Sequence, residues 1–438
     1  MSNNHLTSLT SLITSAVWEI IATYTSIGRT VPSLDSVEPG PFDGAAEDVP
    51  ERLARAVKVI EAACTQLVCT VSNPSGIILD RALAQPDPSC LAIVTDARIA
   101  DLLAEKPDGM HVNQLAEASG LKDSDKLGRV LRLLAAKHIF REVKPNIYAN
   151  NRLSVKLISK NAVSDLVGLM TDEVCLGSAH VNETYFTKPR TPDETAFQRS
   201  TGHTFLDWYK LPENKEKAER FSRAMVARID FQGNFLPKVY PWTRHPPECT
   251  VCDVAGGNGH FTMELLKRKP HFKVILQDQV GVIEQAKKYW AKEYPQAIEE
   301  KKVEYVPFNF LADQAVKGCD VYYIKSVLHD WPDAQCLVIL QNIRNAMKPE
   351  SRLIIHEVSI HTAAYFAQCE AEHPPEPLLP DWGAPAAKTY KFDFVMMALL
   401  GTRARTLEEV VALCERCGLR FQKLYPSREL DMMEFAPV

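Results

Sequence analysis

The sequence lacks the features that mark a membrane-spanning, secreted or nucleic-acid-binding protein. It has no run of about 18 uncharged apolar residues, which a membrane-spanning helix needs. Residues 1–10 lack the positive-then-apolar order of a secretory signal. A formal charge of -5 at pH 7 gives no excess of basic residues for a nucleic-acid surface. We therefore predict no membrane segment, no secretory leader and no nucleic-acid partner.

Cysteine is present, but its pattern does not favour a disulfide framework or a metal site. The 11 cysteines are an odd number and are mostly scattered along the chain. Two CxxC spacings occur, at Cys249/Cys252 and Cys414/Cys417. The first falls on an expected strand, where residues three apart face opposite sides, and the second on an expected helix. We predict isolated, reduced thiols, no metal, and a cytoplasmic protein.

The N-terminal region, residues 1–90, is expected to be helical. The 438 residues, 46% of them hydrophobic, are enough for two or three domains. Apolar spacing predicts helices at 6–27, 50–70 and 76–84, and a linker rich in proline and glycine at 32–50. The apolar stripe over 6–27 fits a helix buried within the chain or one at an interface between two copies.

Residues 91–155 show the pattern of a winged helix-turn-helix, with three helices followed by a short hairpin over 139–149. Such a module can bind DNA. The basic residues of its last helix, over 123–137, are partly balanced by Asp123 and Asp125. A packing or dimerising role is therefore favoured over DNA binding.

Residues 156–245 are expected to form further helices and are rich in aromatic side chains. Core packing explains most of these side chains, and a minority could line an apolar substrate pocket. The residues concerned are Phe205, Trp208, Tyr209, Phe221, Met225, Phe231 and Phe235.

Residues 246–438 alternate between strands and helices, a pattern that predicts a parallel, doubly wound α/β sheet. A last helix over 407–417 and a last strand over 419–425 are expected to close this sheet. The proline-rich stretch 366–389 is predicted to be a loop. Strands are expected at 250–254, 273–277, 303–307, 321–324 and 352–358, and helices at 261–267, 283–290, 334–347 and 390–400.

A glycine-rich turn follows the first of these strands, at residues 255–259. Glycine lets the chain turn sharply and lets a ligand approach the backbone, so Gly256 and Gly257 are candidate binding residues. The second strand ends at Asp278, about 20 residues on, where a doubly wound fold holds ribose hydroxyls. No third glycine completes a dinucleotide fingerprint and no Walker lysine follows. Elimination therefore favours a nucleoside cofactor without a pyrophosphate.

A second motif, LHDWPD at residues 328–333, follows the strand at 321–324. In open α/β sheets, ligands lie outside the carboxyl ends of strands, which places His329 near a ligand. An imidazole, with an ordinary pKa of about 6.5, can take a proton from an acceptor near neutral pH. The alternative for His329 is a core or capping role. Asp330 is expected to cap the next helix rather than to act in catalysis.

Glu357 ends the strand expected over 352–358. A carboxylate next to an imidazole holds its orientation and stabilises its protonated form. Glu357 could serve His329 in this way, or it could be a strand-end charge that faces solvent. His356 is expected to be structural.

Together these motifs resemble the S-adenosylmethionine (SAM)-dependent O-methyltransferases of plant phenylpropanoid and fungal secondary metabolism. The resemblance spans about residues 90–430, and the HDWPD box placed after the glycine motif is quite specific. It implies a Rossmann-like, SAM-binding catalytic domain over 246–438, preceded by the helical region with its winged helix, and a homodimer. The matching segments are DVAGGNG at 253–259, QDQV at 277–280, GCDVYY at 318–323, LHDWPD at 328–333 and Arg405-Thr406.

The resemblance also assigns a role to each candidate residue. Gly256 and Gly257 line the cofactor, and Asp278 binds its ribose. Asn309 and Phe310 flank the adenine, and Lys325 contacts the cofactor from below. His329 is the general base for the acceptor hydroxyl, and Glu357 frames it. Asp393 matches an acidic residue of a later helix, and Met396 and Met397 either edge the acceptor pocket or pack in the core.

Three positions depart from the family pattern. Asn309 stands where an aspartate is frequent, and Ala255 stands where many members have glycine, which is a small change. Ala404 replaces a glutamate that frames the histidine, so Glu357 is expected to act alone. The sequence thus predicts a SAM-dependent O-methyltransferase for a small phenolic acceptor. The alternatives are a catalytically weakened methyltransferase-like binding protein and a transcriptional regulator that uses the winged helix.

Overall fold

The structure is a computed structural model that describes residues 4–44, 49–189, 191, 193–232, 239–362, 365, 373–427 and 430–438. Side chains of residues 226–232 lie outside that description. The chain divides into two compact units. The first comprises residues 1–233, 374–385 and 398–400, and the second comprises residues 234–373, 386–397 and 401–438.

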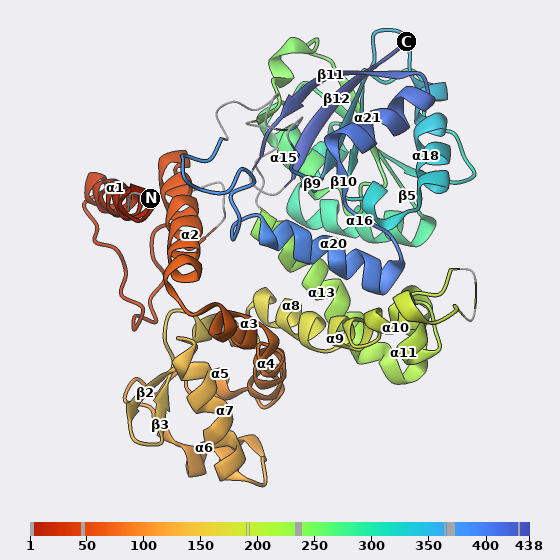
Figure 1. The fold of residues 1–438 in the computed structure, drawn as a ribbon. Coiled ribbons are helices and arrows are strands. Elements are labelled where there is room, and N and C mark those ends of the chain that lie inside the picture. The colour runs from red at the N-terminus through yellow and green to blue at the C-terminus, as the bar shows by residue number, and fades with distance from the viewer. Residues whose placement is uncertain are drawn as a thin grey trace. The chain divides into compact units, whose positions relative to one another are not determined.

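The first unit begins with helix α1 (Asn4–Ser26), which packs against α2 (Glu51–Val71) and is followed by α3 (Pro74–Ala82) (Figure 1). By length and composition alone, α1 could cross a membrane, which the sequence analysis did not expect. The reason is that its polar residues are mostly Ser and Thr. The hydroxyls of Thr10 and Thr14, for example, donate to the helix's own carbonyls. One such helix near the N-terminus is weak evidence for a membrane, because core helices and signal sequences pass the same test.

A small mixed module follows. It contains the helices and the hairpin that the sequence predicts, and its three strands pair antiparallel in the order β1-β3-β2. Asp123 caps α7 by accepting from the Lys126 N–H, and leucines of α7 form the module's core. The elements are α4 (Pro86–Asp96), α5 (Ile99–Leu102), β1 (Met110–His111), α6 (Val112–Ser119), α7 (Ser124–Ala136), β2 (Arg141–Lys144) and β3 (Ile147–Ala149).

Short helices complete the first unit. The rings of Phe205 and Trp208 both meet Phe197 edge-on, with centroids 5.2 and 5.5 Å away, and all three side chains are buried. Core packing is thus confirmed for Phe205 and Trp208, whereas Phe235 and the side chain of Phe231 lie outside the described residues. The elements are η2 (Ser154–Leu157), α8 (Ala162–Thr171), α9 (Glu173–Ser178), α10 (Val181–Phe186), α11 (Ala196–Thr201), α12 (Phe205–Trp208), η3 (Pro212–Asn214) and α13 (Lys215–Gln232).

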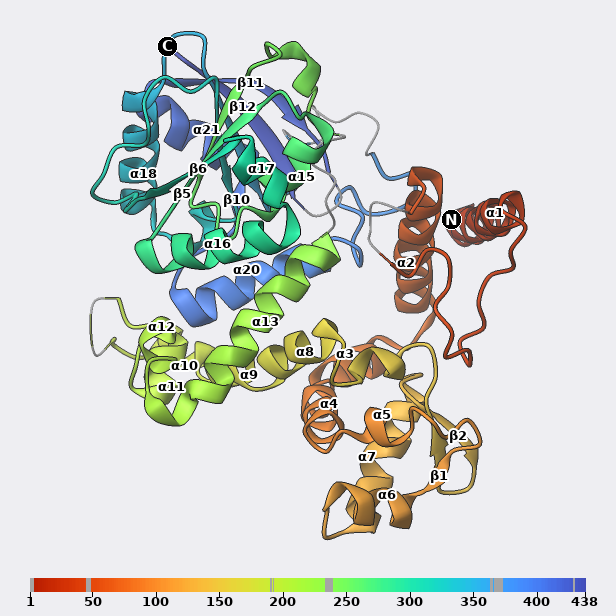
Figure 2. The ribbon, with the colours of Figure 1, turned by 180° about the vertical axis from the view of Figure 1, so that it is seen from behind.

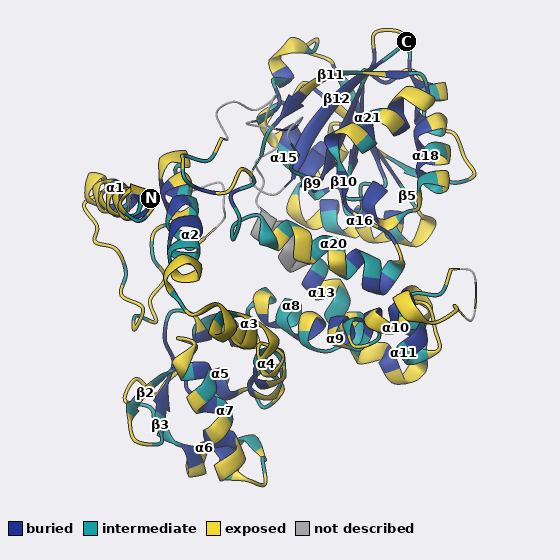
Figure 3. Ribbon diagram, viewed as in Figure 1, coloured by how far each residue is buried: buried dark blue, intermediate teal, exposed yellow. Residues whose placement is uncertain are grey.

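The second unit is built on a seven-stranded sheet in the order β11-β12-β8-β7-β4-β5-β6. Its central strands β4, β7 and β8 are almost wholly buried, as expected for near-continuous apolar runs covered on both faces (Figure 3). Figure 1 shows α21 in front of the sheet, and Figure 2, from behind, shows α15, α16 and α17 in front of it. The strands are β4 (Thr250–Val254), β5 (Lys273–Asp278), β6 (Val303–Pro307), β7 (Val321–Lys325), β8 (Arg352–Glu357), β11 (Leu419–Tyr425) and β12 (Asp431–Pro437).

The remaining elements are η4 (Trp242–Arg244), α15 (His260–Arg268), α16 (Val280–Glu293), α17 (Pro295–Glu299), η5 (Leu328–Asp330), α18 (Asp333–Ala346), α20 (Ala387–Leu400) and α21 (Leu407–Arg416). Of α20, residues 387–397 belong to this unit. A short parallel pair joins β9 (Ser359–Ile360) to β10 (Arg405–Thr406). Of the predicted loop at 366–389, residues 366–372 lie outside the described residues, and residues 373–386 contain no helix or strand.

Strand β12 was not predicted from the sequence. The five strands from β6 to β8 are parallel, as predicted. However, β11 does not close the sheet on β8, because β12 lies between them and pairs antiparallel with both. The sheet is therefore mixed at one edge.

Strand order reverses at β4 and β7. From β4 the chain proceeds outward through β5 and β6 on one side, and then returns to β7 and β8 on the other. A ligand of an open α/β sheet binds outside the carboxyl ends of strands at such a switch point. The segments that follow β4 and β7 are therefore where a ligand site is expected.

Candidate functional site

The glycine turn after β4 leaves room for a ligand against its backbone. A Cβ atom on Gly256 would lie 2.4 Å from Cγ of Asp253 and 2.5 Å from Cδ1 of Leu276, so no larger residue fits there. Gly257 has φ +60° and opens onto free space, because an added Cβ would meet nothing within 4 Å. The turn therefore presents bare backbone at the switch point.

Asp278 ends β5 and lies against this turn. Its Oδ2 accepts from the Gly257 N–H at 2.9 Å, and its Oδ1 accepts from the Gln279 N–H at 2.7 Å. Burial raises the pKa of Asp278, and the two backbone donors oppose that rise. The structure thus brings Gly257 and Asp278 together, as the sequence predicts for a site that holds ribose hydroxyls.

Two neighbours of the turn carry strain or a buried charge. Ala255 has φ +56°, a left-handed conformation that is unfavourable for any residue with a Cβ. Its replacement of glycine is therefore a larger change than the sequence analysis expected. Asp253 is buried and accepts from the Thr262 hydroxyl at 2.8 Å. Burial raises the pKa of Asp253 to about 7, partly offset by that hydroxyl and by the charge of Lys325.

Asn309 and Phe310 follow β6 at the same edge of the sheet. Oδ1 of Asn309 accepts from the Leu311 N–H at 3.1 Å, so it closes its own turn. The ring of Phe310 meets that of Trp331 edge-on, with centroids 5.6 Å apart. This contact joins the segment after β6 to the histidine motif after β7.

Lys325 ends β7, the strand that forms the other side of the switch point. Its charge opposes the rise in the pKa of Asp253 and adds to the fall in the pKa of His356. The next residue, Ser326, has φ +53°, and its N–H donates to the His356 carbonyl at 3.0 Å. The chain therefore bends sharply between the strand and the histidine motif.

His329 and Glu357 form a buried pair. Nδ1 of His329 lies 2.6 Å from Oε2 of Glu357, and both side chains are under 10% exposed. Oε1 of Glu357 accepts from the N–H groups of Val327 and Leu328 at 2.7 and 2.8 Å. The carboxylate therefore holds both the imidazole and the turn that carries it, and the alternative that Glu357 faces solvent is wrong.

The protonation of the pair follows from these contacts. Burial alone would raise the pKa of Glu357, but the charge and hydrogen bond of His329 and the two backbone donors outweigh it and lower that pKa. An ionised carboxylate can only accept, so we assign the proton to Nδ1 of His329. Nε2 is then the nitrogen that can take up a proton.

Asp330 does not cap the following helix, contrary to the sequence prediction. Helix α18 begins at Asp333, its N-cap residue is Pro332, and no side chain caps it. Oδ1 of Asp330 lies instead 3.4 Å from Nε2 of His329. A carboxylate at this nitrogen favours the imidazolium that proton uptake forms.

Helix α20 also contacts His329, and its Phe392 packs against the apolar cluster that contains Ala404. The ring of Phe392 meets the imidazole edge-on, with centroids 5.2 Å apart. Ala404 is buried, and its N–H donates to Oδ1 of Asp393 at 2.8 Å. Asp393 therefore supports this segment. Met396 is also buried.

His356 is structural, as predicted. It is buried, and its Nε2 lies 3.2 Å from the Leu430 carbonyl, which can only accept. Its Nδ1 therefore accepts from the Tyr323 hydroxyl at 2.8 Å. Burial lowers the pKa of His356 well below its ordinary value, so the ring stays neutral.

Two partners of the histidine turn, Phe392 and Arg405, were assigned no role from the sequence, in which Arg405 stood only as part of a matching segment. Arg405 donates to backbone carbonyls 77 and 74 residues away, a relation that no local spacing shows. Its neighbour Thr406 is a readable signal, because Thr406 and Glu409 form a capping box that starts α21. No group of His, Cys, Asp and Glu among the described residues could hold a metal ion, and every cysteine described is a free thiol.

The fold and site define a class of protein. A doubly wound sheet carries a glycine turn and a ribose-type carboxylate at its switch point, with an imidazole–carboxylate pair after the adjacent strand. This is the arrangement of an α/β enzyme that places a nucleoside cofactor beside a histidine.

Comparisons with known proteins give the family. Residues 187–371 match the O-methyltransferase domain, and residues 82–160 match the O-methyltransferase dimerisation domain. A curated relative, 3-O-methyltransferase 2 of Phanerochaete chrysosporium, is 42% identical over 439 residues, which cover 99% of this chain and 97% of the relative. The chain belongs to the SAM-dependent O-methyltransferases, as its motifs predict.

Solved structures share the fold. The mitomycin 7-O-methyltransferase MmcR has a TM-score of 0.68 and 24% identity, covering 83% of this chain and 98% of that one. LepI in complex with SAM has a TM-score of 0.70 and 21% identity, covering 90% of this chain and 96% of that one. The predicted order, a helical N-terminal region followed by a Rossmann-like sheet, is therefore confirmed.

The residues present fit SAM, the cofactor of this family. The open backbone at Gly257 allows close approach, and Asp278 presents its carboxylate at the same turn. Neither Gly257 nor Asp278 requires a pyrophosphate in the ligand, which agrees with the absence of the third glycine of a dinucleotide fingerprint.

Proposed function

We propose that this enzyme methylates a hydroxyl of a small aromatic, phenolic acceptor, with His329 as the general base. The observation that carries the proposal is the 2.6 Å contact between Nδ1 of His329 and Glu357 at the edge of the sheet where the cofactor binds. A phenol has a pKa of about 10 and is mostly neutral near pH 7, so it attacks better when a base removes its proton.

The residues of the chain perform three tasks. Gly256, Gly257 and Asp278 hold the cofactor at the end of β4 and β5, with Lys325 below it and Asn309 and Phe310 beside its adenine. When bound, SAM supplies an electrophilic methyl group on a sulfonium. His329 takes the acceptor proton on Nε2, and the carboxylates of Glu357 and Asp330 stabilise the resulting imidazolium. Holding the two reactants in line can contribute about 7–11 kcal/mol.

The test of the base is His329→Ala. We expect kcat to fall at least about 100-fold, the lower end for general base catalysis, whereas the dissociation constant for SAM stays within about twofold. The assay is a mass shift of one methyl group on a panel of phenols, with SAM affinity measured by calorimetry. Near-normal turnover by His329→Ala would show that His329 is not the general base.

The acceptor class rests on aromatic and methionine side chains of α20, the helix whose Phe392 contacts the histidine, namely Phe392, Met396 and Met397. The same panel should include carboxylic acids and enols, because the base chemistry serves them too. Methylation of the carboxylic acids or enols, but of none of the phenols, would overturn the phenolic assignment.

We further propose a homodimer, on the basis of the matched dimerisation domain and of apolar side chains exposed on α1 and α2. Trp18 is 65% exposed and Val71 is 63% exposed. Apolar patches of this kind mark interfaces between proteins. A monomeric mass in sedimentation at micromolar concentration would refute the dimer. A cytoplasmic location remains part of the proposal, to be tested by fractionation.

One observation favours a second candidate, a catalytically weakened protein that binds cofactor without turnover. Ala404 removes a carboxylate that the family places near the histidine. Tight SAM binding without methyl transfer to any of the acceptors would support this candidate over the first.

A further inference from the structure

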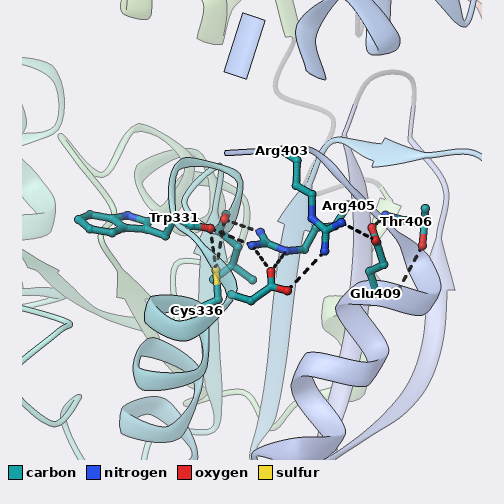
Figure 4. Close-up of polar contacts among 8 residues, drawn as sticks. Trp331, Cys336, Arg403, Arg405, Thr406 and Glu409 are labelled. Carbon is teal, nitrogen blue, oxygen red and sulfur yellow. Dashed lines mark hydrogen bonds and ion pairs between the residues drawn. The ribbon is translucent and has the colours of Figure 1, made fainter. Parts of the chain in front are cut away.

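A buried arginine outside the proposed dyad holds the turn that carries His329. Arg405 lies on β10, and its side chain is only 3% exposed. Figure 4 shows its guanidinium pointing toward Trp331 and Cys336, whereas Arg403 is turned toward Glu409. The function proposed above assigns no task to Arg405.

The guanidinium binds backbone carbonyls of the turn on both sides of His329. Nη1 of Arg405 donates to the Leu328 carbonyl at 2.6 Å, and Nη2 donates to the Trp331 carbonyl at 2.8 Å. Nε and Nη2 also donate to Oδ1 of Asp333, at 3.1 and 2.7 Å. Arg405 therefore links the histidine turn to the first residue of α18.

Arg405 is also paired with β9, the short strand that follows the one carrying Glu357. Arg405 is in register with Ser359 in the parallel pair of β10 and β9. Ser359 comes two residues after Glu357, at the end of β8. The carbonyls of the turn accept from Arg405. The backbone N–H groups of Val327 and Leu328 donate to Glu357. Glu357 at the end of β8 therefore binds N–H groups at the start of the turn, and Arg405 on β10 binds its carbonyls.

Among the described residues, the other donors on these carbonyls are weaker. The N–H of Trp331 reaches the Leu328 carbonyl oxygen only at 3.3 Å. The thiol of Cys336 lies 3.3 Å from the carbonyl oxygens of both Leu328 and Trp331, but a thiol is a weak donor. A guanidinium presents five N–H donors in a rigid plane, and lysine carries its three donors on one nitrogen. Lysine can pair with Asp333, but it cannot reproduce the fork that spans the two carbonyls.

We infer that Arg405 is a positioning residue for methyl transfer, which fixes the 328–331 turn so that the ring of His329 stays against Glu357. This inference rests on the proposed role of His329 as the base. Arg405 affects methyl transfer only through its effect on the position of His329.

The experiment compares Arg405→Met and Arg405→Lys with the control Arg403→Met. Arg403 shares Asp333 and binds Glu409, but it makes no contact with the carbonyls of the turn among the described residues. We expect Arg405→Met to lower kcat about 100-fold, the loss that about 1 Å of misplacement can cause. Arg405→Lys should lie closer to Arg405→Met than to the wild type. The KM for SAM should stay within about twofold, and the control should match the wild type in both constants.

A spectroscopic reading separates positioning from simple loss of stability. In protein with 15N-labelled imidazoles, the Nδ1–H signal of His329 bonded to Glu357 should be lost or moved in both Arg405 variants and kept in Arg403→Met. If Arg405→Met does not fold, Arg405→Lys decides, because it retains the charge beside Asp333. Wild-type kcat in Arg405→Lys, or an equal loss of SAM affinity and kcat with the signal unchanged, would overturn the inference.

The failures of the two proposals are distinguishable. If His329→Ala is inactive and the Arg405 variants are fully active, the base stands and the positioning role is wrong. If His329→Ala retains turnover, the base assignment itself is wrong, and the positioning role falls with it.

Discussion

Replacing Glu357 by glutamine tests the central pair most directly. The carboxylate lies 2.6 Å from Nδ1 of His329 and is buried, so its charge is poorly screened. The charge centres of an imidazolium and a carboxylate in such contact are about 4 Å apart, where opposite charges attract by about 4 kcal/mol at an effective dielectric of about 20. Since about 1.4 kcal/mol is tenfold in rate, Glu357→Gln should lower kcat about 10³-fold.

The substitution also disturbs the tautomer. An amide can turn its NH2 group toward Nδ1, which then becomes the acceptor, so that the ring proton moves to Nε2. Nε2 could then no longer take the proton of the acceptor. The amide oxygen can still accept from the Val327 and Leu328 N–H groups, so the fold should survive.

The assay is steady-state methyl transfer, with SAM calorimetry and thermal unfolding as controls. Because the pKa of Glu357 lies below its ordinary value, this group stays ionised from about pH 6 upward, and assays there compare a charged with a neutral side chain. A variant that binds SAM normally and keeps kcat within about tenfold of the wild type would refute the electrostatic reasoning.

Two further predictions concern the cofactor turn. Asp278→Ala should weaken SAM binding in calorimetry, because the carboxylate at the glycine turn is lost, and unchanged affinity would count against its ribose role. Asp253→Asn should flatten the pH dependence of stability in the cofactor-free protein. Since burial raises the pKa of Asp253 to about 7, the folded state keeps a proton that the unfolded state loses above about pH 4. Wild-type stability should thus fall as the pH rises from about 4 to about 7, by up to about 1.4 kcal/mol per unit. Urea unfolding at pH 5 and 7 measures this, and equal slopes in the two proteins would contradict the assignment.

The sheet was predictable where its strands are continuous apolar runs. The strand at 250–254 agrees with its expected bounds, because an apolar run buried on both faces is distinctive. The strand at 303–307 also agrees, although none of its residues is fully buried. In contrast, β12 contains two carboxylates. Glu434 is buried there only because the Tyr425 hydroxyl donates to it at 2.8 Å and Arg352 lies 3.4 Å away. Such a strand depends on partners distant in sequence, which no local pattern shows.

The residues of the candidate site likewise divide into those that the sequence indicated and those that it did not. The glycine turn, Asp278 and His329 were found because each directly follows a strand, and parallel strands place their carboxyl ends at one edge. Asp330 was misread, because the Pro332-Asp333 pair starts α18 two residues later than a cap at Asp330 would require. The partners Phe392 and Arg405 come from distant segments, so only the folded structure reveals them.

The surroundings of Ala404 bear on how the enzyme manages without the missing glutamate. Ala404 packs with Val358 and Leu430, and Phe392 lies against the same cluster. An ionised carboxylate in this apolar environment would have to pair with His329 to offset its loss of hydration. The chain instead has Phe392, which packs on this cluster, against the imidazole, and the carboxylates of Glu357 and Asp330 lie at its two nitrogens. Glu357 is buried, whereas Asp330 is 44% exposed and contributes at most about 1 kcal/mol, as solvent-exposed ion pairs do. Most of the stabilisation of the imidazolium must therefore come from Glu357, and the geometry that holds this pair together matters more here than in a site with three carboxylates.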